Sequence, residues 1–382
     1  MWRLNRTECA KSAALFVLLL LRVWCPLNTL AEDAELLEAE KLPSLWIKTI
    51  DARAWSGYKD NVLLGNQNTI ASPFLAGGVD LTFMRLPIDG WECVFTSSGE
   101  YIRYLSAPKA SQEANEVLQG QFKKSLDNGW KAGLAAEYLY FNQVFDNSIV
   151  STQFVALPVE GHTLTLRPAV AKDLGKGYRL EFEVPTTRQW FDEFIDNYWE
   201  MGPKLTFGRE YGKKSDISVS YQFTERIHDN REARDADGNV IPGQGLQFRQ
   251  HELAVVWRHF WDEDGQWRTL TKLSLQRNED NGGGFYDFLR PFLFEQLRYR
   301  TKTWEIKGEA RYSFYQYDRE HITDLQSPIR HKTYLRFNLR AEKNLTKSIK
   351  IFGQYEYERA FSNLDIDQYT LNSISAGLDW EF

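Results

Sequence analysis

The sequence predicts an all-β protein that closes into a transmembrane antiparallel β-barrel of about sixteen strands, with short turns at one end and longer loops at the other. Three observations predict this fold. Apolar and polar side chains alternate with a period of two residues through most of the 382 residues. Short and long connections follow one another regularly, and aromatic side chains stand where strands begin.

The composition argues against several other classes of protein. The chain carries 46 Lys and Arg against 52 Asp and Glu, a formal net charge of −6. This balance argues against a nucleic-acid-binding protein, which would carry basic clusters. Aromatic residues make up 14% of the chain, too many for a disordered protein. No stretch reaches the roughly 20 consecutive apolar residues that a spanning helix needs. A soluble β protein and a membrane barrel remain.

The N-terminus has the pattern of a cleaved export signal. A basic start is followed by the apolar segment 12–21 and by Thr29-Leu30-Ala31, which places small residues at a cleavage site. We therefore expect a signal peptide over 1–31, a short acidic periplasmic segment over 32–44 and the barrel over 45–382.

Alternation is clearest in the strands near the C-terminal end. Leu335, Phe337 and Leu339 alternate with Arg336 and Arg340, so one face of this strand is apolar and the other is charged. About ten residues rising ~3.3 Å each and tilted ~40° would cover the roughly 25 Å apolar band of a membrane barrel. The segment 288–299 does not alternate cleanly, so its lumen-facing residues stay unassigned.

Connection lengths supply the topology. Short turns recur at 88–90, 127–129, 175–177, 212–216, 262–266, 300–302 and 345–348. Longer polar connections lie near 57–70, 107–112, 146–160, 191–197, 229–246, 279–285, 318–329 and 362–368. Several short turns have the Asn and Gly residues of tight hairpins. A soluble sandwich has no reason to place every short turn at one end, whereas membrane barrels do.

Aromatic residues indicate a common height at the short-turn end. Five of them stand directly or almost directly after a short turn, a sixth closes the last strand, and all lie on the apolar face of their strands. A sandwich core would explain their number but not their shared height, which a membrane–water interface selects. This expected aromatic girdle consists of Trp91, Trp130, Tyr178, Trp267, Trp304 and Trp380.

The last strand ends in an aromatic residue after a glycine and an alternating segment. Gly377, Leu378, Trp380 and Phe382 resemble the C-terminal insertion signal of the Gram-negative bacterial outer-membrane β-barrel (porin-like) family. The resemblance implies a cell outer-membrane location, short turns in the periplasm and long loops outside. It also implies contact with outer-membrane lipid, and recognition of the last strand by the barrel-assembly machinery with Phe382 as the terminal determinant.

A second resemblance concerns Gly57-Tyr58-Lys59-Asp60-Asn61-Val62. This segment is similar to the Gly-Tyr-Asp-Xaa-Asn-Val motif of barrels that accompany exopolysaccharide export or carry periplasmic helical repeats. Lys59 replaces the usual acid, and no repeat domain is expected before the barrel. The resemblance implies an export function with a periplasmic partner, and the alternative is an ordinary Gly- and Asn-rich start of a loop.

The charged face of the strands should line an aqueous lumen, because sixteen strands enclose more space than side chains fill. The lumen-lining candidates are Arg311, Arg336, Arg340, Lys307, Lys332, Arg179, Glu181, Glu305 and Glu309. Two interpretations stay open. These residues form a charged constriction that selects solutes by sign and size, or a lattice of cross-strand ion pairs that keeps the wall rigid.

We expect no enzyme activity, cofactor, metal site or nucleic-acid partner. The six histidines lack spacing to Ser or Asp partners, and Asp235, Asp237 and Asn239 miss the spacing of a calcium loop. The first functional hypothesis is a porin-like channel for passive passage of small hydrophilic solutes. The alternatives are the export barrel of a secretion or exopolysaccharide system, and a closed structural or adhesive barrel that binds through 229–246. No loop looks long enough to fold inward as a deep constriction.

Overall fold

The computed structural model describes residues 45–66, 69–146, 156–192, 197–322 and 326–382. The expected signal peptide and the segment 32–44 lie outside the described residues. The described part forms eighteen β segments: β1 (Trp46–Lys59), β2 (Ser72–Arg85), β3 (Trp91–Tyr104), β4 (Gln112–Ser125), β5 (Trp130–Asp146), β6 (Ala156–Gly175), β7 (Tyr178–Glu183), β8 (Thr186–Phe191), β9 (Tyr198–Met201), β10 (Lys204–Tyr211), β11 (Ser215–Arg234), β12 (Val240–Phe260), β13 (Trp267–Asp280), β14 (Phe288–Arg300), β15 (Trp304–His321), β16 (Ile329–Asn344), β17 (Ile349–Ser362) and β18 (Tyr369–Glu381).

Two of the strands are each interrupted by a proline, so the eighteen segments make sixteen strands. β7 and β8 both pair with β6 and continue one another across Pro185. β9 and β10 both pair with β11 and continue one another across Pro203. Proline has no N–H to give to the ladder, yet the carbonyls of both prolines still accept hydrogen bonds from the facing strand. The predicted strand number is confirmed.

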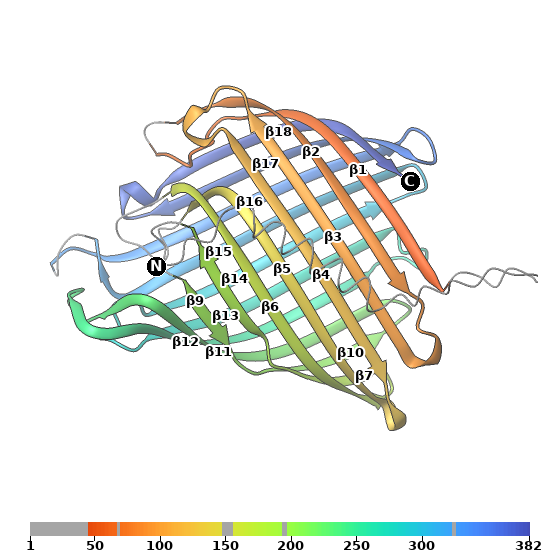
Figure 1. The fold of residues 1–382 in the computed structure, drawn as a ribbon, viewed down its shortest axis with the longest axis horizontal. Helices are drawn as coiled ribbons and strands as arrows, with labels where there is room; N and C mark the ends of the chain where they lie inside the picture. Colours follow the sequence, from red (N-terminus) through yellow and green to blue (C-terminus); the bar gives the residue numbers. More distant parts are fainter. Residues whose placement is uncertain (1–44, 67–68, 147–155, 193–196, 323–325) are drawn as a thin grey trace, which may run out of the picture. The chain divides into compact units, whose positions relative to one another are not determined.

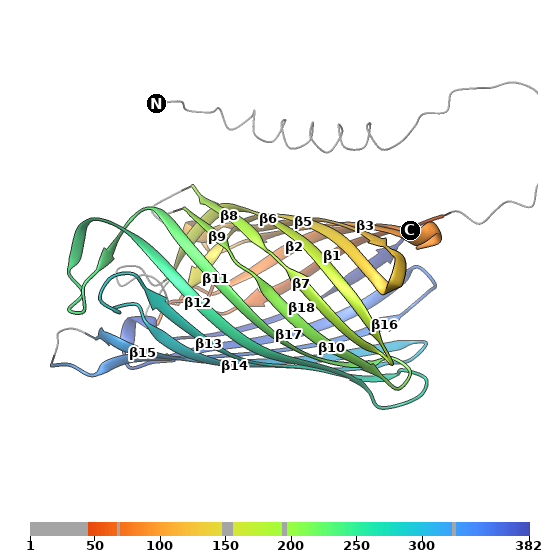
Figure 2. The ribbon, with the colours of Figure 1, turned by 90° about the horizontal axis from the view of Figure 1, so that it is seen from below.

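The sheet closes on itself through its first and last strands. β1 pairs antiparallel with β2 on one side and with β18 on the other, where Asp51 faces Glu381 and Lys59 faces Ser373. Figures 1 and 2 show the tilted strands wrapped into one barrel. Closure leaves no unpaired edge, which is the condition for a sheet to cross a hydrocarbon layer. The predicted antiparallel barrel is confirmed.

Side chains alternate between the outer surface and the lumen. On β16, Phe337 and Leu339 are 39% and 41% exposed on the outside, whereas Arg336 and Arg340 line a cavity inside. The same alternation places Leu273 and Leu275 of β13 outside. The outer surface is therefore apolar and the inner surface charged, as membrane barrels require.

Turns and loops separate to the two ends as predicted, with one correction. All seven short connections lie at the end where β18 finishes, and five of them contain residues with positive φ. These are Asp89, Asn128 and Lys176, each with the glycine that follows it, and Gly175, Gly212 and Gly265. The expected long loop at 229–246 is wrong. β11 continues to Arg234 and β12 starts at Val240, so this segment is a strand hairpin that extends beyond its neighbours (Figure 1).

β14 explains why its segment does not alternate in the sequence. Its lumen face carries Phe288, Phe292 and Phe294, and its outer face carries Leu293 and Leu297, which are 39% and 45% exposed. Apolar residues therefore stand on both faces, beside Arg290 and Arg298 on the lumen face, and a period of two has little contrast to display. Phe288 packs against Tyr315 and Tyr317 of β15.

The connection between β1 and β2 folds into the outer mouth of the barrel. Val62 is fully buried with Phe74 and Tyr104, and Leu64 is buried among Ala360, Tyr369 and Leu371 of β17 and β18. Val144 of β5, three strands beyond β2 around the ring, packs against both clusters. We define the described residues 60–66 and 69–71 as the inward loop. The sequence did not indicate that any loop would narrow the mouth.

Candidate functional site: the lumen wall

The predicted lumen residues lie in three places on the inner wall. Arg311, Arg336 and Arg340 line an outer cavity, and Arg340, Lys307 and Glu305 line a second cavity nearer the periplasmic end. Arg179 and Glu181 of β7 lie apart from these, beside a third cavity. Glu309 sits between Lys307 and Arg311, and Lys332 is fully buried. The structure thus brings the β15 and β16 candidates together and leaves the β7 pair elsewhere.

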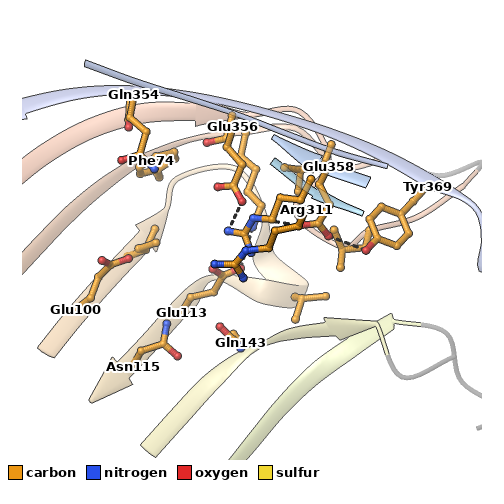
Figure 3. A pocket seen from close by; sticks show the side chains of 18 of the residues that line it. Phe74, Glu100, Glu113, Asn115, Gln143, Arg311, Gln354, Glu356, Glu358 and Tyr369 are labelled. Carbon is orange, nitrogen blue, oxygen red and sulfur yellow. Dashed lines mark hydrogen bonds and ion pairs between the residues drawn. The ribbon is translucent and has the colours of Figure 1, made fainter. Parts of the chain in front are cut away.

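The outer cavity has a volume of about 590 Å³ and lies below the inward loop. Its walls come from β14–β18 and from β1–β5. In Figure 3, Glu100 and Asn115 lie on one side and Glu356 and Glu358 on the other, with the side chain of Arg311 between them. Cations and carboxylates therefore face one shared space, where they can meet a solute.

Arg336 and Arg340 are held by carboxylates on neighbouring positions. Arg336 forms an ion pair with Glu356 and lies 3.8 Å from Glu358 Oε2. Arg340 Nε donates to Glu342 Oε1 at 2.5 Å, and its guanidinium lies 3.8 Å above the ring of Phe352. These contacts fix both guanidinium groups against the wall and neutralise much of their charge.

Two other arginines of the wall, Arg268 and Arg290, form no ion pair among the described residues, and Arg311 forms only a long one. Arg268 Nη2 donates to the amide oxygen of Gln296 at 2.6 Å. Arg290 Nη1 donates to the hydroxyl of Tyr315 at 3.2 Å. The nearest carboxylate to Arg311 is Glu309, at 3.9 Å. The Nε atoms of Arg268 and Arg290 are buried without a hydrogen bond. These three side chains are the best placed to receive an external anion.

The sequence found Arg311 but singled out neither of the other two. Arg290 lies on β14, where both faces are apolar and no alternation marks the lumen side. Arg268 follows Trp267 at the start of β13, on the face expected to line the lumen, but nothing in the sequence shows that its neighbours are cations.

Like charges stand directly opposite one another along a row of four strands. Arg268 of β13 faces Arg298 of β14, Arg298 faces Lys307 of β15, and Lys307 faces Arg340 of β16. We call these four residues the basic row. Neighbouring strands lie roughly 4.8 Å apart, so the cations are close, and like charges in this position destabilise strand pairing.

A second row carries the opposite sign. Asp51 of β1 faces Glu381 of β18 and Asp80 of β2. We call these three residues the acidic row. Asp80 is held by Arg53 at 2.8 Å and by the hydroxyl of Ser98 at 2.5 Å, and Lys350 lies 3.6 Å from Glu381.

The second cavity joins the two rows. Its volume is about 510 Å³, and its lining includes Lys307 and Arg340 from the basic row and the whole acidic row. A solute in this space would meet the basic Lys307 and Arg340 beside Glu305 and Glu342 on β15 and β16, and across from them the acidic row beside Arg53. Such an arrangement can act on the charge and orientation of a solute.

The girdle candidates lie at the periplasmic ends of their strands. Trp91, Trp130, Tyr178, Trp267 and Trp304 are the first residues of β3, β5, β7, β13 and β15, and Trp380 lies one residue before the end of β18. Trp91, Trp130, Trp267 and Trp304 are 37–45% exposed on the outer surface. Of the expected insertion signal, Gly377, Leu378 and Trp380 pair with β1, and the N–H of Phe382 donates to the carbonyl of Ile50.

The acidic residues at the tip of the β11–β12 hairpin hold a turn. Asp235 Oδ1 accepts the backbone N–H groups of Asp237 and Asn239 at 3.0 and 2.9 Å. Hydrogen bonding, first of all from the side chain of Asn239, keeps the pKa of Asp235 below its usual value. This carboxylate is already committed to the backbone of its own turn.

No helix in the described part of the chain is long and apolar enough to cross a membrane.

Comparison with known proteins gives similarity of fold alone. No family model matches the chain, and no curated protein matches it in sequence. Solved structures do align over most of its length. An anion-selective porin from Comamonas acidovorans is 11% identical, covering 88% of this chain and 99% of the porin, with a TM-score of 0.44. Acinetobacter baumannii OccAB3 is 9% identical, covering 88% and 99%, with a TM-score of 0.45. A bacterial polysaccharide outer membrane secretin is 9% identical, covering 87% and 98%, with a TM-score of 0.41.

The architecture of the barrel shows where in the cell the protein lies. Sixteen antiparallel strands close without an edge, their outer surface is apolar, and the inner surface is charged. Short turns lie at one end with both barrel termini, and the longer connections lie at the other. This architecture is that of the outer membrane of Gram-negative bacteria. The chain is therefore an outer-membrane β-barrel.

Proposed function

We propose that the barrel is a porin-like channel for passive passage of small hydrophilic solutes, with charged solutes contacting the lumen wall on β13–β16. The observation that carries this proposal is the basic row. Direct opposition of like charges costs stability in a sheet. Arg298, Lys307 and Arg340 offset part of this cost through ion pairs with Glu305, Glu309 and Glu342. Arg268 forms no ion pair among the described residues, so an anion from solution would meet it beside three further cations.

The under-paired arginines extend this contact surface along the pore. Arg290 lies near the outer end of β14, Arg311 near the middle of β15 and Arg268 near the periplasmic end of β13. An anion leaving one guanidinium would meet another on an adjacent strand. The acidic row offers cations a similar path on the opposite wall, so solute sign decides which wall is used.

Single-channel recording in a planar bilayer with a salt gradient tests the proposal. We expect steady openings in the wild type. In Arg311→Gln and Arg268→Gln, we expect the anion-to-cation permeability ratio to fall by up to about fivefold, since a unit charge at ~4 Å in water changes the energy of an ion by about 1 kcal/mol.

The matched control is Arg359→Gln. This residue lies on the outer face of β17, its guanidinium 4.1 Å from the ring of Phe361, and the change removes the same charge without altering the lumen. An unchanged reversal potential in Arg311→Gln and Arg268→Gln would contradict solute contact with these arginines.

The inward loop is the observation that favours the second candidate, an outer-membrane export barrel. It narrows the outer mouth with residues of the Gly57–Val62 segment, and a narrowed mouth suits a pore that opens with a partner. A barrel that stays silent in the bilayer, while remaining folded, would overturn the passive channel and support export with a periplasmic partner.

A further inference from the structure

Three successive periplasmic turns repeat one structural unit on the outer surface of the barrel. Each unit has a turn residue with positive φ, a glycine with positive φ and an aromatic residue that begins the next strand. The three units are Asp89-Gly90-Trp91, Asn128-Gly129-Trp130 and Lys176-Gly177-Tyr178. They precede β3, β5 and β7.

A basic residue stands directly opposite the aromatic residue in each unit. Trp91 faces Lys124 of β4, Trp130 faces Lys172 of β6, and Tyr178 faces Arg209 of β10. Cross-strand partners point to the same side of a sheet, so these cations lie on the outer surface with the rings.

Each cation lies over the ring that it faces. Lys124 Nζ is 4.2 Å from the ring centroid of Trp91, Lys172 Nζ is 5.0 Å from that of Trp130, and the guanidinium carbon of Arg209 is 4.9 Å from that of Tyr178. Trp304 and Lys343 form a fourth pair at 5.2 Å.

The turn itself fixes the position of the two lysines. Lys124 Nζ donates to the carbonyl of Asp89 at 3.1 Å, and Lys172 Nζ donates to the carbonyl of Asn128. These carbonyls belong to the turn residues with positive φ. An ammonium group has three donors, so two N–H bonds of each lysine remain for an external acceptor.

Carboxylates near these cations are engaged elsewhere. Asp89 lies 3.9 Å from Arg85, Asp173 accepts the N–H of Gly175 at 2.8 Å, and Glu210 lies 3.4 Å from Arg179. In the described part of the chain, Lys124, Lys172, Arg209 and Lys343 form no ion pair. Four outward cations at one rim thus lack an internal anion.

Apolar side chains continue the outer surface above two of the rings. Trp91 packs against Phe122 with ring centroids 4.7 Å apart, and Tyr178 stacks on Phe207 at 5.7 Å. These two units therefore combine a cation, a flat aromatic surface and an apolar surface, which match the phosphate, glycerol and acyl chains of a phospholipid.

We propose that these cation–aromatic pairs are binding sites for the phosphate headgroups of phospholipids in the periplasmic leaflet, with a preference for anionic lipids such as phosphatidylglycerol. The cation meets the headgroup, and the ring and the apolar side chains above it meet the lipid beyond the phosphate. The sites hold the periplasmic rim at a fixed depth in the leaflet. This binding is independent of whether the lumen conducts.

Native mass spectrometry of the full chain in detergent, titrated with phosphatidylglycerol, tests the proposal. Near a membrane surface one basic residue changes lipid affinity by about fivefold, so Lys124→Gln with Lys172→Gln should weaken phosphatidylglycerol binding by about 25-fold. The control is Lys123→Gln with Lys131→Gln. Lys123 directly precedes Lys124 on β4 and Lys131 directly follows Trp130 on β5, so both lysines point to the lumen side of the sheet, and the double change removes the same charge.

We expect the control to bind phosphatidylglycerol as the wild type does, and both double variants to keep the heat-modifiable gel mobility of a folded barrel. Equal binding by the wild type and the Lys124→Gln, Lys172→Gln variant would overturn the proposal. Equal loss in the two double variants would also overturn it, because net charge rather than the rim sites would then control binding.

Discussion

At the residue scale, Gly57 shows how close packing limits the side chains that fit at the closing seam, which is the pairing of β1 with β18. A Cβ at this position would lie 2.3 Å from the carbonyl oxygen of Ile374 and 2.6 Å from Phe74 Cζ. A Cβ added to Gly99, on the outer face of β3, would have no other heavy atom within 4 Å. Both glycines lie inside strands, where a glycine weakens the strand unless close approach requires it.

We expect Gly57→Ala to destabilise the barrel by about 1–3 kcal/mol, because a methyl group would force the backbone of β18 and the ring of Phe74 to move. Gly99→Ala should be neutral or stabilise by up to about 1 kcal/mol, because alanine loses less conformational entropy. Urea unfolding of the refolded protein in lipid vesicles measures both. Similar unfolding midpoints for the two variants would contradict this prediction, because they would show that β1 and β18 make room for the added methyl group.

Arg290 marks the limit of residue-level prediction. Alternation identified Arg311, Arg336 and Arg340 because each stands between apolar neighbours that face outward. Arg290 stands among Phe288 and Phe292, which face the lumen, so period two carries no information there. The sequence also does not show the register between neighbouring strands. Only the register reveals that Arg268 faces Arg298.

At the element scale, the membrane explains which strand ends could be predicted. Strands alternate where one face meets lipid and the other meets the lumen. Beyond the membrane neither face of β11 and β12 meets lipid, and Ala233 and Leu246 instead pack against Phe285 and Tyr286. The alternation stops there, and the polar sequence looks like a loop although the hairpin continues to Arg234 and Val240. The ladder there is also irregular, with register shifts after Ile227 and after Glu232.

The inward loop depends on tertiary contacts that local sequence does not specify. Its length could be predicted, but the burial of Val62 and Leu64 depends on side chains of β2, β3, β17 and β18. Asn61 anchors the loop. Its Nδ2 donates to the carbonyls of Gly65 and Thr370 at 2.8 and 2.9 Å, and its Oδ1 accepts the N–H of Gly65 at 2.9 Å.

We expect Asn61→Ala to release the inward loop and raise the single-channel conductance of an open barrel. Each buried partner left unsatisfied costs about 1–3 kcal/mol, which disfavours the folded-in loop. The control is Asn66→Ala, whose side chain donates to Asp365 at an exposed site. Conductance equal to that of the wild type in Asn61→Ala would show that the loop does not limit the pore.

At the scale of the whole molecule, closure decides where the charges meet. β18 returns to β1 and thereby places Glu381, from the end of the chain, opposite Asp51, from the start of the barrel. The acidic row exists only in the closed barrel, and so does the second cavity that joins it to the basic row. Both are properties of the closed sheet rather than of any single strand.

The same seam makes the last residue a test of how the barrel assembles. Phe382 is 77% exposed, and its N–H bonds to the carbonyl of Ile50 at 2.9 Å. Its ring therefore buries little surface in the finished barrel. We expect deletion of Phe382 to leave the unfolding midpoint of refolded protein within about 1 kcal/mol of the wild type, the worth of one hydrogen bond.

In cells the same deletion should lower the amount of folded protein in the outer membrane several-fold, because the resemblance of the last strand to an insertion signal makes the terminal aromatic ring a recognition element rather than a packing one. Heat-modifiable mobility of outer-membrane fractions measures this amount, and Phe382→Tyr, which keeps the ring, should insert normally. A deletion that weakens the refolded barrel as much as it reduces insertion would instead make Phe382 a structural part of the seam.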